Sequence, residues 1–179
     1  MTKNYLFVHG YKGRPDLPPW FLWAADELRK KNECVTMVPQ MPFPEAPVLE
    51  AWLRVIFRSV HEQDFPESTL IGHSLGGIAI LKALEESPQQ AAHVVLVGVP
   101  MSAVNNGIAP FFVEPLNLEL IKTKAKKFTC MYSKDDPYVP FEHGEYFAEK
   151  LGAELVSFEN KGHFEGLKEF PEFVFQLYL

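Results

Sequence analysis

The sequence contains little cysteine, no long apolar run and no excess of basic residues. Its two cysteines among 179 residues, Cys34 and Cys130, lack the close spacing of a metal site, so we expect a reducing, cytoplasmic environment. The first ten residues, MTKNYLFVHG, hold too few apolar side chains for a signal peptide or a membrane span. A disulfide-stapled secreted domain and a membrane protein are therefore not expected.

The charge balance argues against a nucleic-acid partner. The net charge is −6 and the sequence pI is about 5.5, whereas a nucleic-acid-binding domain presents a basic face or stripe. The one dense basic stretch, KTKAKK at residues 122–127, runs directly into an apolar segment. It is more typical of a solvated helix end than of a phosphate-binding patch.

The overall composition is that of a soluble globular domain. Hydrophobic residues make up 47% of the chain, aromatic residues 13% and charged residues 22%, which suffices for one sizeable core. The sequence shows no internal repeat, low-complexity tract or convincing linker. We therefore expect residues 1–179 to form a single domain.

Apolar runs alternate with longer amphipathic stretches along the whole chain. The apolar runs lack polar–apolar alternation, as expected for parallel strands that are covered on both faces. They lie at 5–9, 34–38, 69–73, 94–98, 128–132 and 154–158, and the amphipathic stretches lie at 17–31, 47–62, 75–87, about 116–126, 141–151 and 169–179. This alternation predicts βαβ units with right-handed crossovers, and hence one six-stranded parallel sheet with helices on both faces.

Ser74 stands at the centre of a G-x-S-x-G pattern between the third apolar run and a helical stretch. An abrupt strand-to-helix turn strains the central residue and holds its side chain out at the sheet edge, so Gly72 and Gly76 leave room for chain segments that pass closely. The bare pattern occurs by chance in roughly 5% of chains of this length. A small-residue packing turn is the alternative, and it must also explain Gly77, which weakens a helix by about 1 kcal/mol relative to alanine. We favour a nucleophile.

The first apolar run is followed by Gly10, where the backbone can approach another segment closely. The N–H groups of Tyr11 and Leu75 would then form an oxyanion hole for a tetrahedral intermediate. A strand order of 2-1-3-4-5-6 places the first and third strands together at the switch point where doubly wound sheets bind ligands. The same order separates Cys34 from Cys130 by four strand spacings, about 19 Å, which excludes a disulfide.

His163 is the histidine best placed to act as a general base. It lies in a glycine-containing turn directly after the last predicted strand, at the sheet edge that carries Ser74. His73 directly precedes Ser74, so the chain should turn its side chain away, and we expect His9 and His73 to be buried and hydrogen-bonded. A base of this kind is oriented by an acid, which should follow the fifth strand.

Two adjacent aspartates, Asp135 and Asp136, follow the fifth strand in the stretch SKDDPYVP. Adjacent residues in an extended chain point to opposite sides, so only one of them can face His163. Pro137 favours an extended conformation at Asp136. That conformation is compatible with the role of the orienting acid but does not decide between the two.

Together these residues resemble the α/β-hydrolase superfamily, and within it the small, lidless serine hydrolases related to retinoblastoma-binding protein 9. The resemblance runs through VHGYKG, PPWFLWAADEL, MPFPEAPVLEAW, IGHSLGG, SKDDPYVP and KGHF, of which the last three are the most specific. In this family the acid begins a D-x-x-V/I-P pattern, which Asp136 fits with Val139 and Pro140. The resemblance thus implies a triad of Ser74, Asp136 and His163.

The resemblance also implies a reaction and a type of substrate. A small carboxylic ester or thioester would be cleaved through an acyl-enzyme on Ser74, with no metal or cofactor. The segment after the fourth strand, VPMSAVNNGIAPFFVEP, is too short for a large helical lid, so we expect a shallow, open site. Met101, Phe111 and Phe112, with the proline-rich rim VPQMPFPEAP, are candidates for an apolar acyl pocket. Loops packed on the core would explain each of these residues equally well.

Two other functions stay open at this stage. The first is a hydrolase-fold acyltransferase or lyase, and the second is a protein-binding module with a vestigial site. A degenerate site should have lost a triad or oxyanion element, and here all are kept. The name of the family suggests binding to the retinoblastoma protein, usually through an L-x-C-x-E motif, but neither Cys34 nor Cys130 fits that motif. A protein partner therefore stays open but is unsupported by a binding motif.

Overall fold

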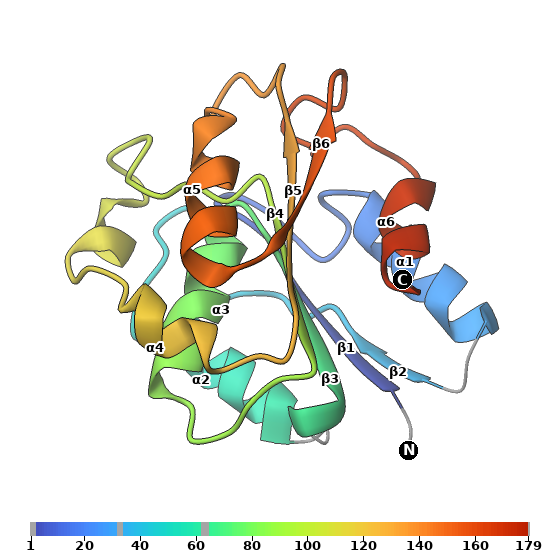
Figure 1. Ribbon diagram of the computed structural model, residues 1–179, viewed down its shortest axis with the longest axis horizontal. Helices are drawn as coiled ribbons and strands as arrows, with labels where there is room; N and C mark the ends of the chain where they lie inside the picture. The colour runs from blue at the N-terminus through green and yellow to red at the C-terminus, as the bar shows by residue number, and fades with distance from the viewer. Residues whose placement is uncertain (1–2, 32–33, 62–64, 179) are drawn as a thin grey trace.

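The computed structural model describes residues 3–31, 34–61 and 65–178. Its strands form one parallel sheet in the order β2-β1-β3-β4-β5-β6, with helices on both faces (Figure 1). The strands are β1 (Lys3–Val8), β2 (Cys34–Met37), β3 (Ser68–His73), β4 (His93–Val97), β5 (Phe128–Ser133) and β6 (Glu154–Phe158). The predicted strand order and α/β-hydrolase architecture are confirmed, and strand ends differ from the prediction by at most two residues.

The helices divide between the two faces of the sheet. α1 and α6 pack on one face, and α2 to α5 pack on the other (Figure 1). They are α1 (Trp20–Lys31), α2 (Leu49–His61), α3 (Leu75–Glu86), α4 (Leu118–Lys122), α5 (Glu142–Leu151) and α6 (Pro171–Gln176), with 3-10 helices η1 (Phe65–Glu67) and η2 (Ala109–Phe112). Residues 62 and 179, at the ends of two predicted helices, lie outside the described residues.

The helix predicted at about 116–126 is shorter than expected. Asn117 is the N-cap of α4, and its side-chain oxygen accepts a hydrogen bond from the N–H of Leu120. The helix ends at Lys122. Beyond it, the carbonyl of Lys124 and the N–H of Lys126 both bond to the backbone of Ala91, at 2.9 and 3.0 Å. The chain leaves the helix because these residues continue the sheet ladder toward β5.

Alternate side chains of the central strands enter two separate cores. In β1, Leu6 and Val8 pack toward α3, whereas Tyr5 and Phe7 pack toward α1 and α6. All five residues of β4 are buried. Burial on both faces explains why the strand sequences show no polar–apolar alternation.

The strand register brings several chain segments to one edge of the sheet. Val8 pairs with Gly72, and His73 pairs with Val97, which in turn pairs with Met131. The loops that follow β1, β3, β4 and β5 therefore begin at nearly the same level. This is the edge at which the parallel strands of an α/β sheet bind ligands.

Cys34 and Cys130 are both free, as the separation of β2 from β5 requires. Burial raises the pKa of the Cys130 thiol to about 12, so this side chain is part of the core rather than a reactive group. Within the three described ranges, no helix combines the length and the apolar character that crossing a membrane requires.

Candidate active site

Ser74 occupies a strained turn between β3 and α3. Its backbone angles are φ 52° and ψ −125°, which a non-glycine residue rarely adopts. A Cβ on Gly72 would lie 2.4 Å from the Cα of Gly77, and a Cβ on Gly76 would lie 2.1 Å from the carbonyl oxygen of Val8. The close passage predicted for both glycines is confirmed, and it forces the sharp turn that exposes Ser74.

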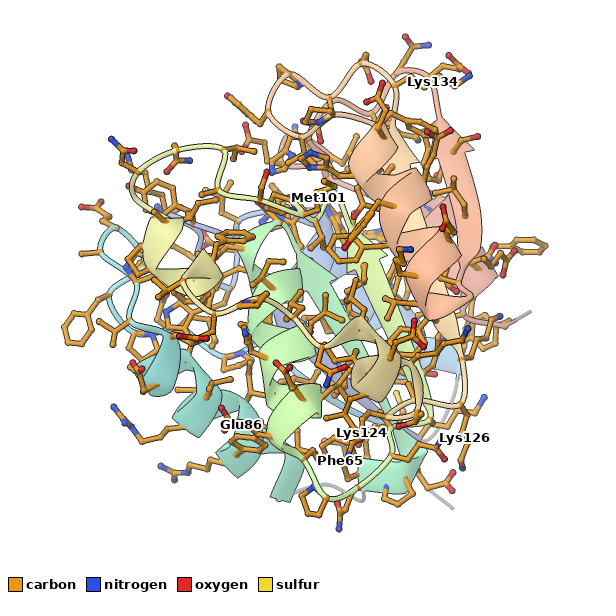
Figure 2. All side chains as sticks on the ribbon, turned by 60° about the vertical axis from the view of Figure 1, so that its left-hand side comes forward. Phe65, Glu86, Met101, Lys124, Lys126 and Lys134 are labelled. Carbon is orange, nitrogen blue, oxygen red and sulfur yellow. The ribbon has the colours of Figure 1, made fainter. Side chains whose placement is uncertain are left out.

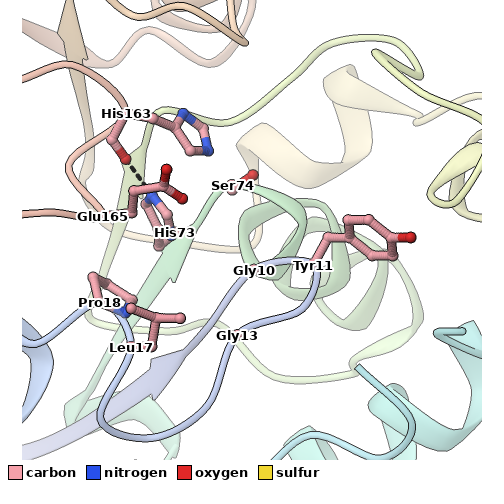
Figure 3. A pocket seen from close by; sticks show the side chains of 9 residues that line it. All are labelled: Gly10, Tyr11, Gly13, Leu17, Pro18, His73, Ser74, His163 and Glu165. Atoms are coloured by element: carbon pink, nitrogen blue, oxygen red, sulfur yellow. Dashed lines mark hydrogen bonds between the residues drawn. The ribbon is translucent and has the colours of Figure 1, made fainter. Parts of the chain in front are cut away.

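The backbone that follows β1 runs beside Ser74. A Cβ on Gly10 would lie 2.9 Å from the Cβ of Ser74, and Tyr11 lines the same cavity as Ser74 (Figure 3). Leu75 is the first residue of α3, so its N–H has no acceptor within the helix. The structure thus brings both candidate oxyanion donors, Tyr11 and Leu75, next to the candidate nucleophile.

Asp136 and His163 form a buried hydrogen-bonded pair. His163 Nδ1 lies 2.7 Å from Asp136 Oδ2, and the two side chains are only 7% and 1% exposed. The other carboxylate oxygen of Asp136 accepts hydrogen bonds from the N–H groups of Tyr138 (2.8 Å) and Val139 (2.9 Å). Since Nδ1 faces the carboxylate, Nε2 is the ring nitrogen that is left for chemistry at the cavity shared with Ser74.

Asp135 faces the backbone of the turn that carries His163. Its Oδ1 accepts hydrogen bonds from Ser133 Oγ and from the N–H of Gly162, the latter at 3.0 Å. Ser133 Oγ in turn accepts a hydrogen bond from the N–H of Lys161 at 3.0 Å. The hydrogen bond from Ser133 holds the pKa of Asp135 below its ordinary value. Of the two aspartates, only Asp136 therefore contacts the imidazole, and Asp135 instead fastens the turn.

Two cavities flank Ser74, with volumes of about 530 and 40 Å³. Four residues line both of them: Tyr11, Ser74, His163 and Glu165. The larger cavity is completed by Lys12, Val104, Asn105, Ile108, Pro137, Tyr138 and Val139, and the smaller one by Gly10, Gly13, Leu17, Pro18 and His73.

The candidate pocket residues Met101, Phe111 and Phe112 do not line either cavity at Ser74. Met101, Phe111 and Phe112 line a third cavity of about 260 Å³ that does not include Ser74. Phe111 is only 1% exposed because η2 turns its ring into the core, where it lies 5.3 Å from the ring of Trp52. Met101 lies on the loop after β4 and is 43% exposed (Figure 2).

The apolar lining near Ser74 comes instead from residues that the sequence analysis did not select. Val104 and Ile108 lie further along the loop after β4, and Tyr138 belongs to the loop that carries the candidate acid. The Tyr138 ring stands edge-on to the His163 ring, with centroids 5.3 Å apart. The only signal for Tyr138 was its position two residues after Asp136.

Comparison with known proteins gives consistent matches over almost the whole chain. A family model described as "Serine hydrolase" matches residues 5–178. The Bacillus subtilis protein YdeN is 31% identical over 179 residues, covering 96% of this chain and 92% of YdeN. The crystal structure of the ydeN gene product superimposes with a TM-score of 0.91 at 28% identity, covering 99% of this chain and 97% of that chain. "Serine hydrolase RBBP9" of Rattus norvegicus is 27% identical over 158 residues, 87% of this chain and 82% of that protein.

Replacing Gly76 by alanine tests the tight passage beside Ser74. The added methyl group would collide with the Val8 carbonyl oxygen, so we expect Gly76→Ala to lower the free energy of unfolding by about 2 kcal/mol or more. Gly166→Ala is the matched control, because nothing lies within 4 Å of a Cβ there. Urea unfolding measures both, and equal stability of the two variants would contradict the proposed packing.

Proposed function

The chain belongs to the serine hydrolase family, and on that premise we propose that it hydrolyses a small carboxylic ester or thioester at Ser74. One observation carries the proposal. The 2.7 Å contact between Asp136 Oδ2 and His163 Nδ1 places an oriented imidazole at the cavity that contains Ser74. A nucleophile, a base and an acid that orients the base are the parts that acyl transfer requires.

In the first half-reaction, Ser74 Oγ attacks the acyl carbonyl of the substrate while His163 Nε2 takes the hydroxyl proton. Asp136 keeps the proton of the imidazole on Nδ1 and stabilises the imidazolium that forms. The N–H groups of Tyr11 and Leu75 stabilise the negative charge on the carbonyl oxygen of the tetrahedral intermediate. His163 then gives its proton to the leaving alcohol or thiol, and the acyl group stays on Ser74.

In the second half-reaction, water attacks the acyl-enzyme after the alcohol or thiol has left. His163 removes a proton from the water as the water oxygen attacks the acyl carbonyl, and the same oxyanion donors stabilise the second intermediate. Collapse of this intermediate breaks its bond to Ser74 Oγ, which recovers its proton from His163. The products are the carboxylic acid and free enzyme, so no oxidant, metal or cofactor enters the balance.

The larger cavity is the proposed site of the acyl group. Its volume of about 530 Å³ lies within the range of small-molecule sites. Val104, Ile108 and Tyr138 supply an apolar lining beside Ser74. The volume and the apolar lining support a substrate with a short or medium apolar acyl chain.

Glu165 gives the proposed site a negative charge at its mouth. The side chain is exposed, lines both cavities, and has no hydrogen-bond or ion-pair partner within the described part of the chain. Lys12, the one lysine or arginine that lines these two cavities among the described residues, lines only the larger one. A leaving group that lies beside Glu165 therefore meets an unpaired carboxylate, which disfavours anionic leaving groups.

A fluorophosphonate probe tests the nucleophile. We expect the wild-type protein to gain one phosphonyl group at Ser74, because the probe imitates an ester under attack, and we expect Ser74→Ala to gain none. Intact mass spectrometry followed by peptide mapping measures both. Equal labelling of the Ser74→Ala variant, or no labelling of the folded wild type, would sink the proposed function.

The two aspartates give a matched pair of variants. Asp136→Asn should lower kcat on the order of 10⁴-fold, because the amide favours the wrong tautomer of His163. Asp135→Asn should stay within about tenfold, a shift of roughly 1.4 kcal/mol or less, because its amide oxygen still accepts from Gly162. Steady-state hydrolysis of a chromogenic ester measures both, and an exchange of the two effects would show that Asp135 is the orienting acid.

Substituting Glu165 tests whether its negative charge disfavours anionic leaving groups. Glu165→Gln should raise kcat/KM for 4-carboxyphenyl butyrate about threefold relative to 4-nitrophenyl butyrate. The substitution removes the repulsion between two exposed carboxylates, and exposed charge interactions are of this size. The gain should shrink at high salt because exposed charges are screened. Lys12→Gln serves as the control and should not raise the ratio. An equal change for both esters in Glu165→Gln would rule out charge selection by this residue.

A further inference from the structure

His73 makes an unusual contact with the backbone of the proposed base. This residue directly precedes Ser74 and is only 4% exposed. Its Nε2 lies 2.7 Å from the main-chain carbonyl oxygen of His163 (Figure 3). Because a carbonyl oxygen only accepts hydrogen bonds, the ring proton of His73 must be on Nε2.

The other ring nitrogen of His73 has no hydrogen-bond partner in the described part of the chain. Burial lowers the pKa of His73 to about 3, so the ring is neutral near pH 7 and its Nδ1 carries no proton. Nδ1 is buried and forms no hydrogen bond with any residue that the structure describes. His9, by contrast, uses both nitrogens, with Nδ1 3.0 Å from the carbonyl of Gly10 and Nε2 accepting from the N–H of Met41 at 3.0 Å. An unpaired buried nitrogen lowers stability, and among the described residues the polar contact that His73 makes in return is the bond from its Nε2 to the carbonyl of His163.

The turn that carries His163 is held by hydrogen bonds before this residue and by a buried side chain after it. Before it, Gly162 donates to Asp135, and Lys161 donates to Ser133. After it, Phe164 has a positive φ of 59° and a fully buried ring. The bond to His73 is the one contact, among those described, that ties the backbone of His163 itself to the segment that carries Ser74.

We propose that His73 is a positioning residue that sets the separation of His163 from Ser74 through its Nε2–H···O=C hydrogen bond. The bond joins the backbone of the base to the residue next to the nucleophile. It therefore fixes the backbone of His163 relative to the end of β3, one residue before Ser74. The inference rests on the proposed function of Ser74 and His163. Misplacement of a reacting group by about 1 Å costs on the order of a hundredfold in rate.

Glutamine and methionine provide a matched pair of substitutions. They have similar length and shape, but only glutamine carries an N–H near the position of His73 Nε2. His73→Met should lower kcat by roughly ten- to a hundredfold while KM stays within about threefold, because the reacting groups and not the acyl cavity are disturbed. His73→Gln should recover kcat to within about fivefold of the wild type.

Folding is measured separately by urea unfolding of the same proteins. We expect both variants to fold and to unfold cooperatively, and His73→Met to have the lower urea midpoint, since it leaves the carbonyl oxygen of His163 without its donor. The proposal is overturned if His73→Met keeps the wild-type kcat, or if His73→Gln is no faster than His73→Met. Phosphonylation of Ser74 in the wild-type protein reports on the proposed function independently, so failure of one idea is distinguishable from failure of the other.

Discussion

The hydrogen bond between Asp136 and His163 is the contact on which the rest of the site depends. A carboxyl group whose side chain is 1% exposed is tolerated only when its oxygens are bonded, and three donors serve Asp136: His163 Nδ1 and the N–H groups of Tyr138 and Val139. These bonds fix the carboxyl group before any substrate arrives. The ring of His163 is then held with one nitrogen toward Asp136 and the other free for proton transfer.

The two adjacent aspartates act on different parts of the same turn. Asp136 bonds to the ring of His163, whereas Asp135 and Ser133 bond to the backbone N–H groups of Gly162 and Lys161. One carboxylate thus orients the side chain, and the other holds the loop from which it projects. A doubled charge at the end of β5 is compatible with this arrangement because each carboxylate has its own set of donors.

The sequence predicted those features that depend on local pattern. The sheet order and the strained turn at Ser74 follow from buried strands, helical stretches and the spacing of two glycines. The choice of Asp136 over Asp135 needed the family spacing to Val139, and the structure supplies its physical reason, since the N–H of Val139 bonds to Asp136. The buried position of Phe111 could not be predicted, because its inward turn depends on packing against Trp52 rather than on its neighbours in sequence.

Proton NMR of the resting protein, with ¹⁵N-labelled histidine to assign the signal, tests the central hydrogen bond most directly. A proton held between His163 Nδ1 and Asp136 Oδ2 should resonate well downfield of the backbone amides. The account predicts this signal in the wild type and in Asp135→Asn, and its loss in Asp136→Asn with the fold intact. Persistence of the signal in Asp136→Asn, or its loss in Asp135→Asn alone, would contradict the account.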